Sequence, residues 1–234
     1  MDVSRLKLIV ARRVLEDYTG VLREADVLGI GTGSTVRFFI DEMIRLGLHR
    51  GKKLVVSSMD TLFYLAQKGI HAYTPHIVGR IDVYVDGFDE ASTRLDLVKG
   101  RGAALLWEKQ LALRAEERIY IGDYTKYTGR NYLYKKPVPV EVVPAAIPYA
   151  MERLREFGEP VLRPGKARDG PVVTDSGNYI VDLVVDRIDD AVETDRMIRL
   201  INGVVETGIF PRILVDRVYI AFPDGSVKVF GAGD

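Results

Sequence analysis

Short apolar runs alternate with longer amphipathic segments through the first half of the chain. The apolar runs, which predict buried strands, lie at residues 27–30, 53–56, 70–73, 81–85 and 118–121. Apolar residues recur at helical spacing in the segments 4–19, 34–43, 61–68 and 102–117. This alternation predicts a parallel sheet with helices on both faces, and ligands bind such sheets at the carboxyl ends of the strands.

The pattern changes near residue 130, beyond which prolines interrupt the chain at positions 137, 139, 144 and 148. Strands are predicted at 140–143, 161–162, 172–174, 179–183 and 204–206, and helices at 149–157 and 189–201. Two more strands, 218–221 and 227–230, flank the turn Pro223-Asp224-Gly225. The second half of the chain therefore predicts a small α+β unit followed by a short strand pair.

The composition is typical of a soluble globular protein and argues against nucleic acid, membranes and metal ions as partners. The 234 residues are 47% hydrophobic and 28% charged, and the formal net charge is zero, so no global field attracts nucleic acid or an anionic membrane. No apolar run is long enough to span a bilayer, and no signal-peptide pattern is present. There are no cysteines, and the three histidines lack a tight ligand spacing. We therefore expect no metal centre, no nucleic acid and no membrane partner.

A glycine-rich loop, Gly29–Thr35, connects the first strand to the next helix. Its glycines, hydroxyls and helix N-terminus are suited to hold a phosphate. No lysine follows the last glycine, so it is not a Walker A loop, and Ser34 replaces the third glycine of a dinucleotide fingerprint. A tight turn with a capping serine would explain the pattern without a ligand, but we favour phosphate binding.

An acidic pair, Asp86 and Asp89, flanks Gly87 where the strand 81–85 ends. The two carboxylates could bind sugar hydroxyls and relay protons, or they could cap a solvated turn. The spacing alone does not decide between these readings.

A second loop, Lys99–Gly102, precedes the helix 102–117 and combines two cations with two glycines. It is either a second anion cradle or a solvent-exposed loop. Glu108 lies in the helix that follows, where the adjacent Lys109 is typical of an ordinary surface position. Lys126 follows the strand 118–121, again at the predicted carboxyl edge of the sheet.

Seven motifs then occur in one order along nearly the whole chain. They are Gly29–Thr35, Ser57-Ser58, Val85–Glu90, Lys99–Ala104 with Glu108-Lys109, Pro139–Val142, Val173–Asn178 and Gly203–Phe210. In this register the sequence resembles the ribose-5-phosphate isomerases of the A type. The resemblance implies an aldose–ketose isomerase that interconverts D-ribose 5-phosphate and D-ribulose 5-phosphate through a cis-enediolate. This reaction belongs to the non-oxidative branch of the pentose phosphate pathway and uses no metal or organic cofactor.

The same resemblance assigns the catalytic and binding residues. Glu108 matches the proton-transferring base, Lys99 would stabilise the developing oxyanion, and Asp86 and Asp89 would bind hydroxyls and shuttle a proton. The implied substrate-binding residues are Thr32, Gly33, Ser34, Thr35, Asp86, Gly87, Phe88, Asp89, Lys99, Gly100, Arg101, Gly102 and Lys126.

Three residues depart from the family pattern. Phe88 stands where a small residue is usual, and we expect its side chain to face the core. Arg101 stands where a glycine is usual, and it either adds a phosphate contact or faces solvent. Ser176 replaces an asparagine in a turn. None of these departures removes a proposed catalytic group.

The resemblance also implies the architecture and the setting. A Rossmann-like α/β catalytic domain, residues 1–130 plus 205–234, is interrupted by an inserted ferredoxin-like α+β domain at 131–204 that we expect to serve oligomerisation. Members of the family are dimers or tetramers, so we expect a cytoplasmic homodimer or homotetramer.

Two other functions use related folds. A sugar-phosphate-sensing regulator domain would need a DNA-binding element, and the sequence has no helix-turn-helix before residue 20. Such a regulator would also have no use for Lys99 and Glu108. A transferase acting on coenzyme A thioesters would need its nucleophilic carboxylate in another context. We favour the isomerase over both.

Overall fold

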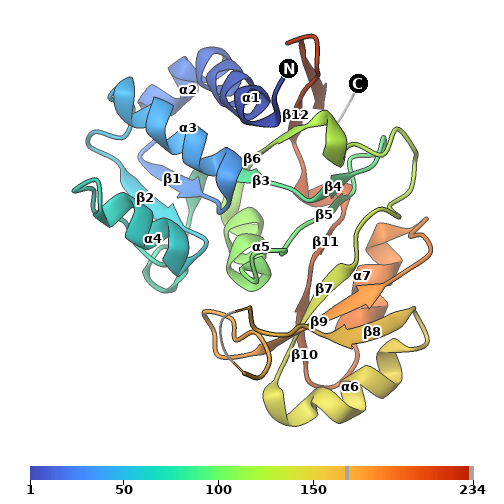
Figure 1. The fold of residues 1–234 in the computed structure, drawn as a ribbon. Helices are drawn as coiled ribbons and strands as arrows, with labels where there is room; N and C mark the ends of the chain where they lie inside the picture. The colour runs from blue at the N-terminus through green and yellow to red at the C-terminus, as the bar shows by residue number, and fades with distance from the viewer. Residues whose placement is uncertain (167–168, 232–234) are drawn as a thin grey trace. The chain divides into compact units, whose positions relative to one another are not determined.

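A computed structural model describes residues 1–166 and 169–231 (Figure 1). Residues 167–168, in the predicted inserted domain, and residues 232–234, in the predicted catalytic domain, lie outside the described residues. The chain forms two compact units. Unit 1 comprises Met1–Phe88, Trp107–Tyr127 and Leu214–Asp234, and unit 2 comprises Asp89–Leu106 and Thr128–Ile213. The predicted limits of the two domains, and the oligomerisation role of one of them, stay predictions.

Unit 1 contains a six-stranded sheet in the order β13-β12-β6-β3-β1-β2. Its strands are β1 (Val27–Ile30), β2 (Lys53–Val56), β3 (Ile81–Gly87), β6 (Ala115–Asp123), β12 (Arg217–Ala221) and β13 (Val227–Gly231). All neighbours pair in parallel except β12 and β13, which form an antiparallel hairpin. Because the chain runs outward from β1 to β2 and then returns to β3 on the other side of β1, the strand order reverses between β1 and β3. Ligands bind at such reversal points in open α/β sheets.

Helices cover this sheet, and their buried faces follow helical spacing. They are α1 (Val3–Asp17), α2 (Thr19–Glu24), α3 (Ser34–Arg45), α4 (Met59–Ala66) and α5 (Leu105–Arg114), with 3-10 turns η1 (Pro75–Ile77), η2 (Tyr124–Lys126) and η4 (Arg212–Leu214). Leu6, Val10 and Val14 of α1 are fully buried four residues apart, in one core with Val83 and Val85 of β3. Because side chains alternate along a strand, Tyr84 and Asp86 lie on the opposite face of β3.

Unit 2 contains an antiparallel sheet built from a βαββαβ segment. The elements are β7 (Val138–Val142), η3 (Pro144–Ala146), α6 (Ile147–Leu154), β8 (Glu159–Leu162), β9 (Tyr179–Val184), α7 (Ala191–Arg199) and β10 (Val204–Thr207), with sheet order β10-β7-β9-β8. This order is the ferredoxin-like arrangement. A second sheet of unit 2 joins three two-residue strands, β4 (Glu90–Ala91), β5 (Leu97–Val98) and β11 (Ile209–Phe210).

The predicted fold class, a Rossmann-like parallel sheet with a small ferredoxin-like α+β part, is confirmed. Two predicted strands are wrong: residue Tyr73 of the segment 70–73 and residue Val173 of the segment 172–174 form only single bridges. The predicted helix 102–117 is shorter, because Ala115 pairs with Ile81 at the start of β6. Pairing with a neighbouring strand here overrides the helical preference of alanine and glutamate.

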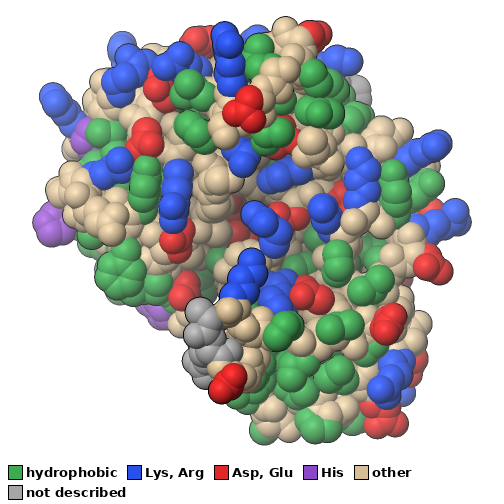
Figure 2. All heavy atoms as spheres, viewed as in Figure 1, with side chains coloured by type: hydrophobic (Ala, Val, Ile, Leu, Met, Phe, Trp, Pro, Cys, Tyr) green, Lys and Arg blue, Asp and Glu red, His purple; other side chains and the backbone are tan. Residues whose placement is uncertain are grey.

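Within residues 1–166 and 169–231, no helix is long and apolar enough to cross a membrane, and no group of three or more metal-ligating side chains comes together. Acidic and basic side chains are interspersed over the face drawn in Figure 2.

Candidate active site

The loop between β1 and α3 forms an anion-binding geometry in unit 1. Gly33 has a φ of 106°, a conformation that suits glycine, and it turns the chain into α3. The first backbone N–H groups of this helix have no intrahelical partners and carry partial positive charge. The Thr35 side chain is buried, and its hydroxyl oxygen makes no hydrogen bond with any described residue. A phosphate at this helix N-terminus would supply the missing partner.

Two further polar contacts fix the loop. Ser58, the N-cap of α4, donates a hydrogen bond from Oγ to Thr32 Oγ1 at 2.9 Å. Lys7 of α1 donates from Nζ to Ser34 Oγ at 2.9 Å, which brings a positive charge to the start of α3. The sequence reasoning missed Lys7, because nothing in the helical pattern of α1 marks it and its partner lies 27 residues away.

Asp86 is completely buried near the carboxyl end of β3 and accepts hydrogen bonds from several donors. Its Oδ1 atom accepts from the backbone N–H groups of Thr32, at 3.0 Å, and Gly87, at 2.6 Å. Its Oδ2 atom accepts from the Tyr84 hydroxyl. Gly31 makes this approach possible, since a Cβ there would lie only 1.9 Å from Asp86 Oδ1. The carboxylate is therefore tied directly to the glycine-rich loop Gly29–Thr35.

Glu108, on α5, is a second buried carboxyl group of unit 1, and like Asp86 it acts on the tyrosines Tyr84 and Tyr120. Its side chain is 3% exposed, so it is not the ordinary surface glutamate that Lys109, itself buried, led us to weigh. Burial and then the charges of Asp86 and Glu108 raise the pKa of the Tyr84 hydroxyl well above its usual 10. Burial, with the charges of the same two carboxylates, also raises the pKa of Tyr120. Two carboxylates thus share one buried environment with two neutral phenols, an arrangement suited to proton transfer.

Phe88 and Lys126 complete the predicted residues of unit 1. The Phe88 ring is buried against Gly122, where a Cβ would lie 2.5 Å from its Cζ atom. Its backbone carbonyl accepts a hydrogen bond from Lys126 Nζ, and that ammonium lies 5.7 Å from the centre of the ring. The side chain of Phe88 therefore faces the core, as the sequence led us to expect.

Asp89 and Arg101 contact each other in unit 2. The backbone N–H of Arg101 donates to Asp89 Oδ2 at 3.0 Å, and Arg101 Nε lies 3.6 Å from Asp89 Oδ1. The Arg101 side chain is 80% exposed, so solvent screens this ion pair. Of the two expectations for Arg101, the solvent-facing one agrees with this exposure.

The Lys99–Gly102 loop is held by its own backbone and by Arg163. Gly100 has a φ of 91°, and a Cβ there would lie 2.8 Å from Leu105 Cβ. Arg163 Nη1 donates to the carbonyl of Arg101 at 3.0 Å and to that of Gly100 at 3.3 Å. Asp182 fixes the same guanidinium, with Arg163 Nε 2.8 Å from its Oδ2. Lys99 itself is buried. The sequence reasoning missed Arg163, because its partners lie far away along the chain, in the 100–101 loop and at Asp182.

Buried polar contacts explain two of the family motifs. Glu141 of β7 is 1% exposed, and its Oε1 atom accepts hydrogen bonds from Thr174 Oγ1 at 2.8 Å and Asn178 Nδ2 at 2.9 Å. Ser176 joins this turn through its backbone N–H, which donates to Thr174 Oγ1 at 3.3 Å. This backbone contact does not depend on which side chain stands at position 176, so the departure leaves it intact.

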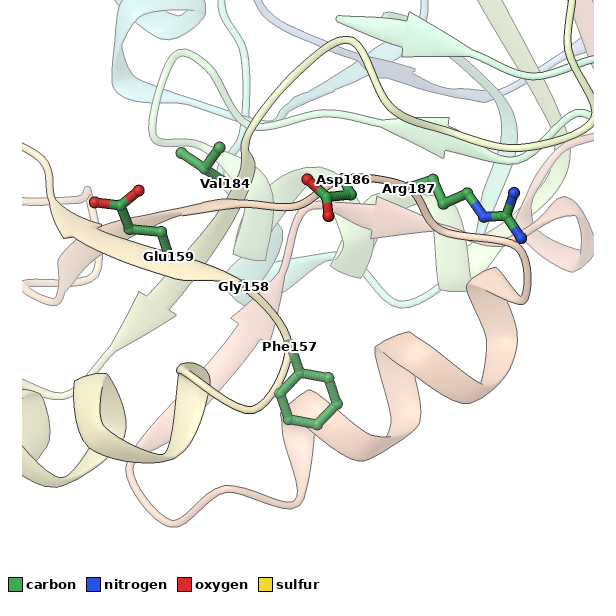
Figure 3. A pocket seen from close by; sticks show the side chains of 6 residues that line it. All are labelled: Phe157, Gly158, Glu159, Val184, Asp186 and Arg187. Carbon is green, nitrogen blue, oxygen red and sulfur yellow. The ribbon is translucent and has the colours of Figure 1, made fainter.

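A separate hollow of about 730 Å³ on unit 2 offers no comparable chemistry (Figure 3). It is lined by Phe157, Gly158, Glu159, Val184, Asp186 and Arg187. Arg187 is paired with Asp189 at 2.7 Å, and none of the predicted site residues lines the hollow. We assign no function to it.

The predicted residues divide between the two units. Unit 1 carries Thr32–Thr35, Asp86, Gly87, Phe88, Glu108 and Lys126, and unit 2 carries Asp89 and Lys99–Gly102. Within unit 1 the structure brings Asp86 together with Thr32 and Gly87, and it places Asp86 and Glu108 where both act on Tyr84. Within unit 2 it brings Asp89 together with Arg101. Tyr84 joins the unit 1 group although the sequence did not single it out; its position two residues before Asp86 on the same strand face was the available signal.

Comparison with known proteins places the chain in a family. The family model for ribose 5-phosphate isomerase A (phosphoriboisomerase A) matches residues 53–225. Ribose-5-phosphate isomerase A of Pyrococcus furiosus is 40% identical over 230 residues, which cover 96% of this chain and 97% of the relative.

Solved structures agree along the whole chain. A D-ribose-5-phosphate isomerase in complex with phospho-erythronic acid superposes with a TM-score of 0.90 at 37% identity, covering 99% of this chain and 100% of the other. Ribose 5 phosphate isomerase A from Neisseria gonorrhoeae gives a TM-score of 0.88 at 34% identity and covers 100% and 99%. The chain therefore belongs to the ribose 5-phosphate isomerase A family of enzymes.

Proposed function

We propose that this enzyme interconverts D-ribose 5-phosphate and D-ribulose 5-phosphate by moving a proton between C2 and C1. The observation that carries the proposal is a pair of buried carboxylates, Asp86 and Glu108, that act on the same two buried tyrosines, with Asp86 hydrogen-bonded to Thr32 of the glycine-rich loop. The family match favours catalysis over the sensor domain, for which buried proton-transfer groups would have no use.

Glu108 is the proposed base. In the open-chain aldose, its carboxylate takes the proton from C2, and the electrons of that C–H bond form the C1–C2 double bond of an enediolate. Glu108 then returns the proton to C1, which gives the ketose. A carbon acid this weak needs a base that is held close to the C–H bond, and the low exposure of Glu108 favours such a fixed position.

Three other residues are proposed to stabilise the charge of the enediolate, move one hydroxyl proton and bind a sugar hydroxyl. Lys99 stabilises the negative charge that develops on the carbonyl oxygen as the enediolate forms. Asp86 moves the hydroxyl proton between O2 and O1, and Asp89 binds a sugar hydroxyl. The hydrogen bonds that Asp86 accepts from Thr32 and Gly87 hold its carboxylate in one orientation for this exchange.

The phosphate is proposed to bind at the N-terminus of α3. The backbone N–H groups come from Gly33, Ser34 and Thr35, since that of Thr32 donates to Asp86, and the hydroxyls come from Thr32, Ser34 and Thr35; Lys7 and Lys126 are the proposed cations. The buried Thr35 hydroxyl supports this assignment, because a phosphate oxygen is a strong acceptor for it. Phe88, Gly87 and the Gly100–Gly102 backbone complete the proposed substrate contacts.

We also propose the wider setting of the reaction. The enzyme would act in the non-oxidative branch of the pentose phosphate pathway, in the cytoplasm, as a homodimer or homotetramer, without a metal or organic cofactor. Light scattering of the purified chain would give the oligomeric state, and a monomer of about 26.2 kDa would contradict that part of the proposal.

The test of the reaction is turnover of D-ribose 5-phosphate in D₂O with EDTA present, followed by NMR. A base that exchanges its proton with solvent places deuterium at C1 of ribulose 5-phosphate and at C2 of the recovered ribose 5-phosphate. Conversion with no deuterium in either sugar would mean that the transferred hydrogen never exchanges with solvent, either because it moves as a hydride or because the buried base returns the same proton. Loss of turnover in Glu108→Gln would then identify the base, and retained turnover would exclude the Glu108 mechanism. Binding without conversion would support the sensor domain instead.

A further inference from the structure

Lys99 is a buried cation whose surroundings are set by a segment without an assigned role. Its side chain is 2% exposed and leaves the end of β5, which pairs antiparallel with β11. A buried ammonium must be compensated by its neighbours, and a catalytic one must also be held in place. The segment Gly208–Phe210 lies beside Lys99 in unit 2 and supplies contacts that can meet both needs.

Gly208 links two sheets and holds the backbone of Lys99. It lies between the end of β10 and the start of β11, where the chain passes from the four-stranded to the three-stranded sheet. Its N–H donates to the Pro139 carbonyl at 2.7 Å, and its carbonyl accepts from the Lys99 N–H at 2.8 Å. Gly208 thereby fixes Lys99 to the rigid strand β7.

No larger residue fits at position 208. A Cβ there would lie 2.2 Å from the Lys99 carbonyl oxygen and 2.8 Å from Pro139 Cδ. Both neighbours are constrained, one by its backbone hydrogen bond and the other by the proline ring in a sheet. Relief of the contact would therefore displace the Lys99 backbone by about 1 Å, enough to cost about a hundredfold in rate when it moves a reacting group.

Phe210 lies under the charged end of the same lysine. Its ring is fully buried, and its centre lies 5.4 Å from Lys99 Nζ. A cation within about 6 Å of an aromatic ring is attracted to its face, most strongly where water is excluded. Gly208 therefore contacts the backbone of Lys99 and Phe210 its ammonium.

We propose that Gly208 and Phe210 are positioning residues that act on the reaction through Lys99. The inference rests on the proposed function, in which Lys99 stabilises the developing oxyanion. It gives the motif Gly203–Phe210 a role: a backbone clamp and an aromatic face for the catalytic ammonium.

A double-mutant cycle on kcat tests the inference. The variants are Gly208→Ala, Phe210→Leu and Lys99→Met, with each of the first two also made in the Lys99→Met background. We expect Lys99→Met to lower kcat by about 10²- to 10³-fold, as loss of an oxyanion donor does. Gly208→Ala should lower kcat about 100-fold and Phe210→Leu about 5-fold, each with KM changed less than about threefold because ground-state binding is preserved.

The decisive result is the behaviour in the Lys99→Met background. If Gly208 and Phe210 act through Lys99, each substitution should there change kcat by less than about twofold. Full, additive losses in that background would overturn the inference, since a general structural effect does not depend on Lys99. Full activity of Lys99→Met would reject the proposed role of Lys99 itself, and with it the inference, and so separates the two failures.

Phe39→Leu is the matched control for lost packing. Phe39 is also fully buried but belongs to the core around α1 and α3 in unit 1. It should lower the melting temperature about as much as Phe210→Leu while leaving kcat within about twofold, since it makes no contact with a reacting group. If Gly208→Ala does not fold, the Phe210→Leu arm alone decides the question. A fall of kcat in Phe39→Leu equal to that in Phe210→Leu would contradict a specific role for Phe210.

Discussion

Replacement of Gly31 by alanine should disturb the site at its most crowded point. A Cβ at position 31 would lie 1.9 Å from Oδ1 and 2.0 Å from Cγ of Asp86. Ordinary contacts begin near 3.4 Å, so the carboxylate must retreat by about 1.5 Å or the loop must move. Either shift weakens the hydrogen bonds that Asp86 accepts from Thr32 and Gly87.

The magnitude follows from these two effects. Overpacking costs about 1–3 kcal/mol, and a weakened hydrogen bond to a charged group costs about 1.5–3 kcal/mol. We expect Gly31→Ala to lose about 3 kcal/mol of unfolding free energy, which lowers the melting temperature by about 10 °C in a chain of this size. A displacement of more than about 1 Å at a proton-shuttling carboxylate should lower kcat about 100-fold.

Calorimetry and the isomerisation assay measure both quantities, and Gly20→Ala is the control. Gly20 lies in α2, and among the described residues no atom beyond its chain neighbours and its own helix backbone lies within 4 Å of a Cβ built there. Alanine there should leave kcat unchanged and raise stability by about 0.5 kcal/mol, because it favours the helix. Wild-type activity and stability in Gly31→Ala would refute the close packing of Gly31 on Asp86 and its role in the reaction.

Three further outcomes follow from the geometry. Thr35→Val should raise KM for the sugar phosphate about tenfold without loss of melting temperature, because it removes a hydroxyl that has no partner among the described residues; an unchanged KM would contradict phosphate binding there. Arg163→Met should lower kcat/KM about tenfold and the free energy of unfolding by about 2 kcal/mol, because it removes the donor to the Gly100 and Arg101 carbonyls and leaves Asp182 unpaired. Steady-state kinetics and urea unfolding measure the two effects, and wild-type values for both would contradict this prediction. Burial raises the pKa of Glu141 above its usual 4.5, so the folded state binds more protons, and the contribution of Glu141 to stability should fall as pH rises from about 4.5 through its raised pKa. The unfolding free energy of the wild type should therefore decline relative to that of Glu141→Gln between about pH 4 and pH 8, and a difference that grows with pH would show the wrong sign.

The sequence predicted the parts of the site whose demands are local. The loop Gly29–Thr35 needs glycines because its backbone turns into a helix, and that demand is visible in the residues themselves. The strand before Asp86 is a run of apolar residues, and its burial follows from that run. The order of strands and helices likewise predicted the parallel sheet.

The features that could not be predicted from the sequence depend on contacts between residues far apart along the chain. The burial of Glu108 depends on how α5 meets the Tyr84 face of β3, whereas the neighbouring Lys109 indicated a solvated surface. Lys7 and Arg163 contact loops that lie far away along the chain. The short strands β4, β5 and β11 have two residues each, too few for any periodic pattern to appear.

The most direct measurement of the central claim is isomerisation of D-ribose 5-phosphate with EDTA present, by the wild type and by Glu108→Gln. Glu116→Gln is the control, because Glu116, on β6, is half exposed and forms an ion pair with Arg80. We predict rapid turnover by the wild type and the control, a loss of about 10³-fold or more in Glu108→Gln, and little change in KM. Wild-type turnover in Glu108→Gln would contradict the assignment of the base and the mechanism built on it.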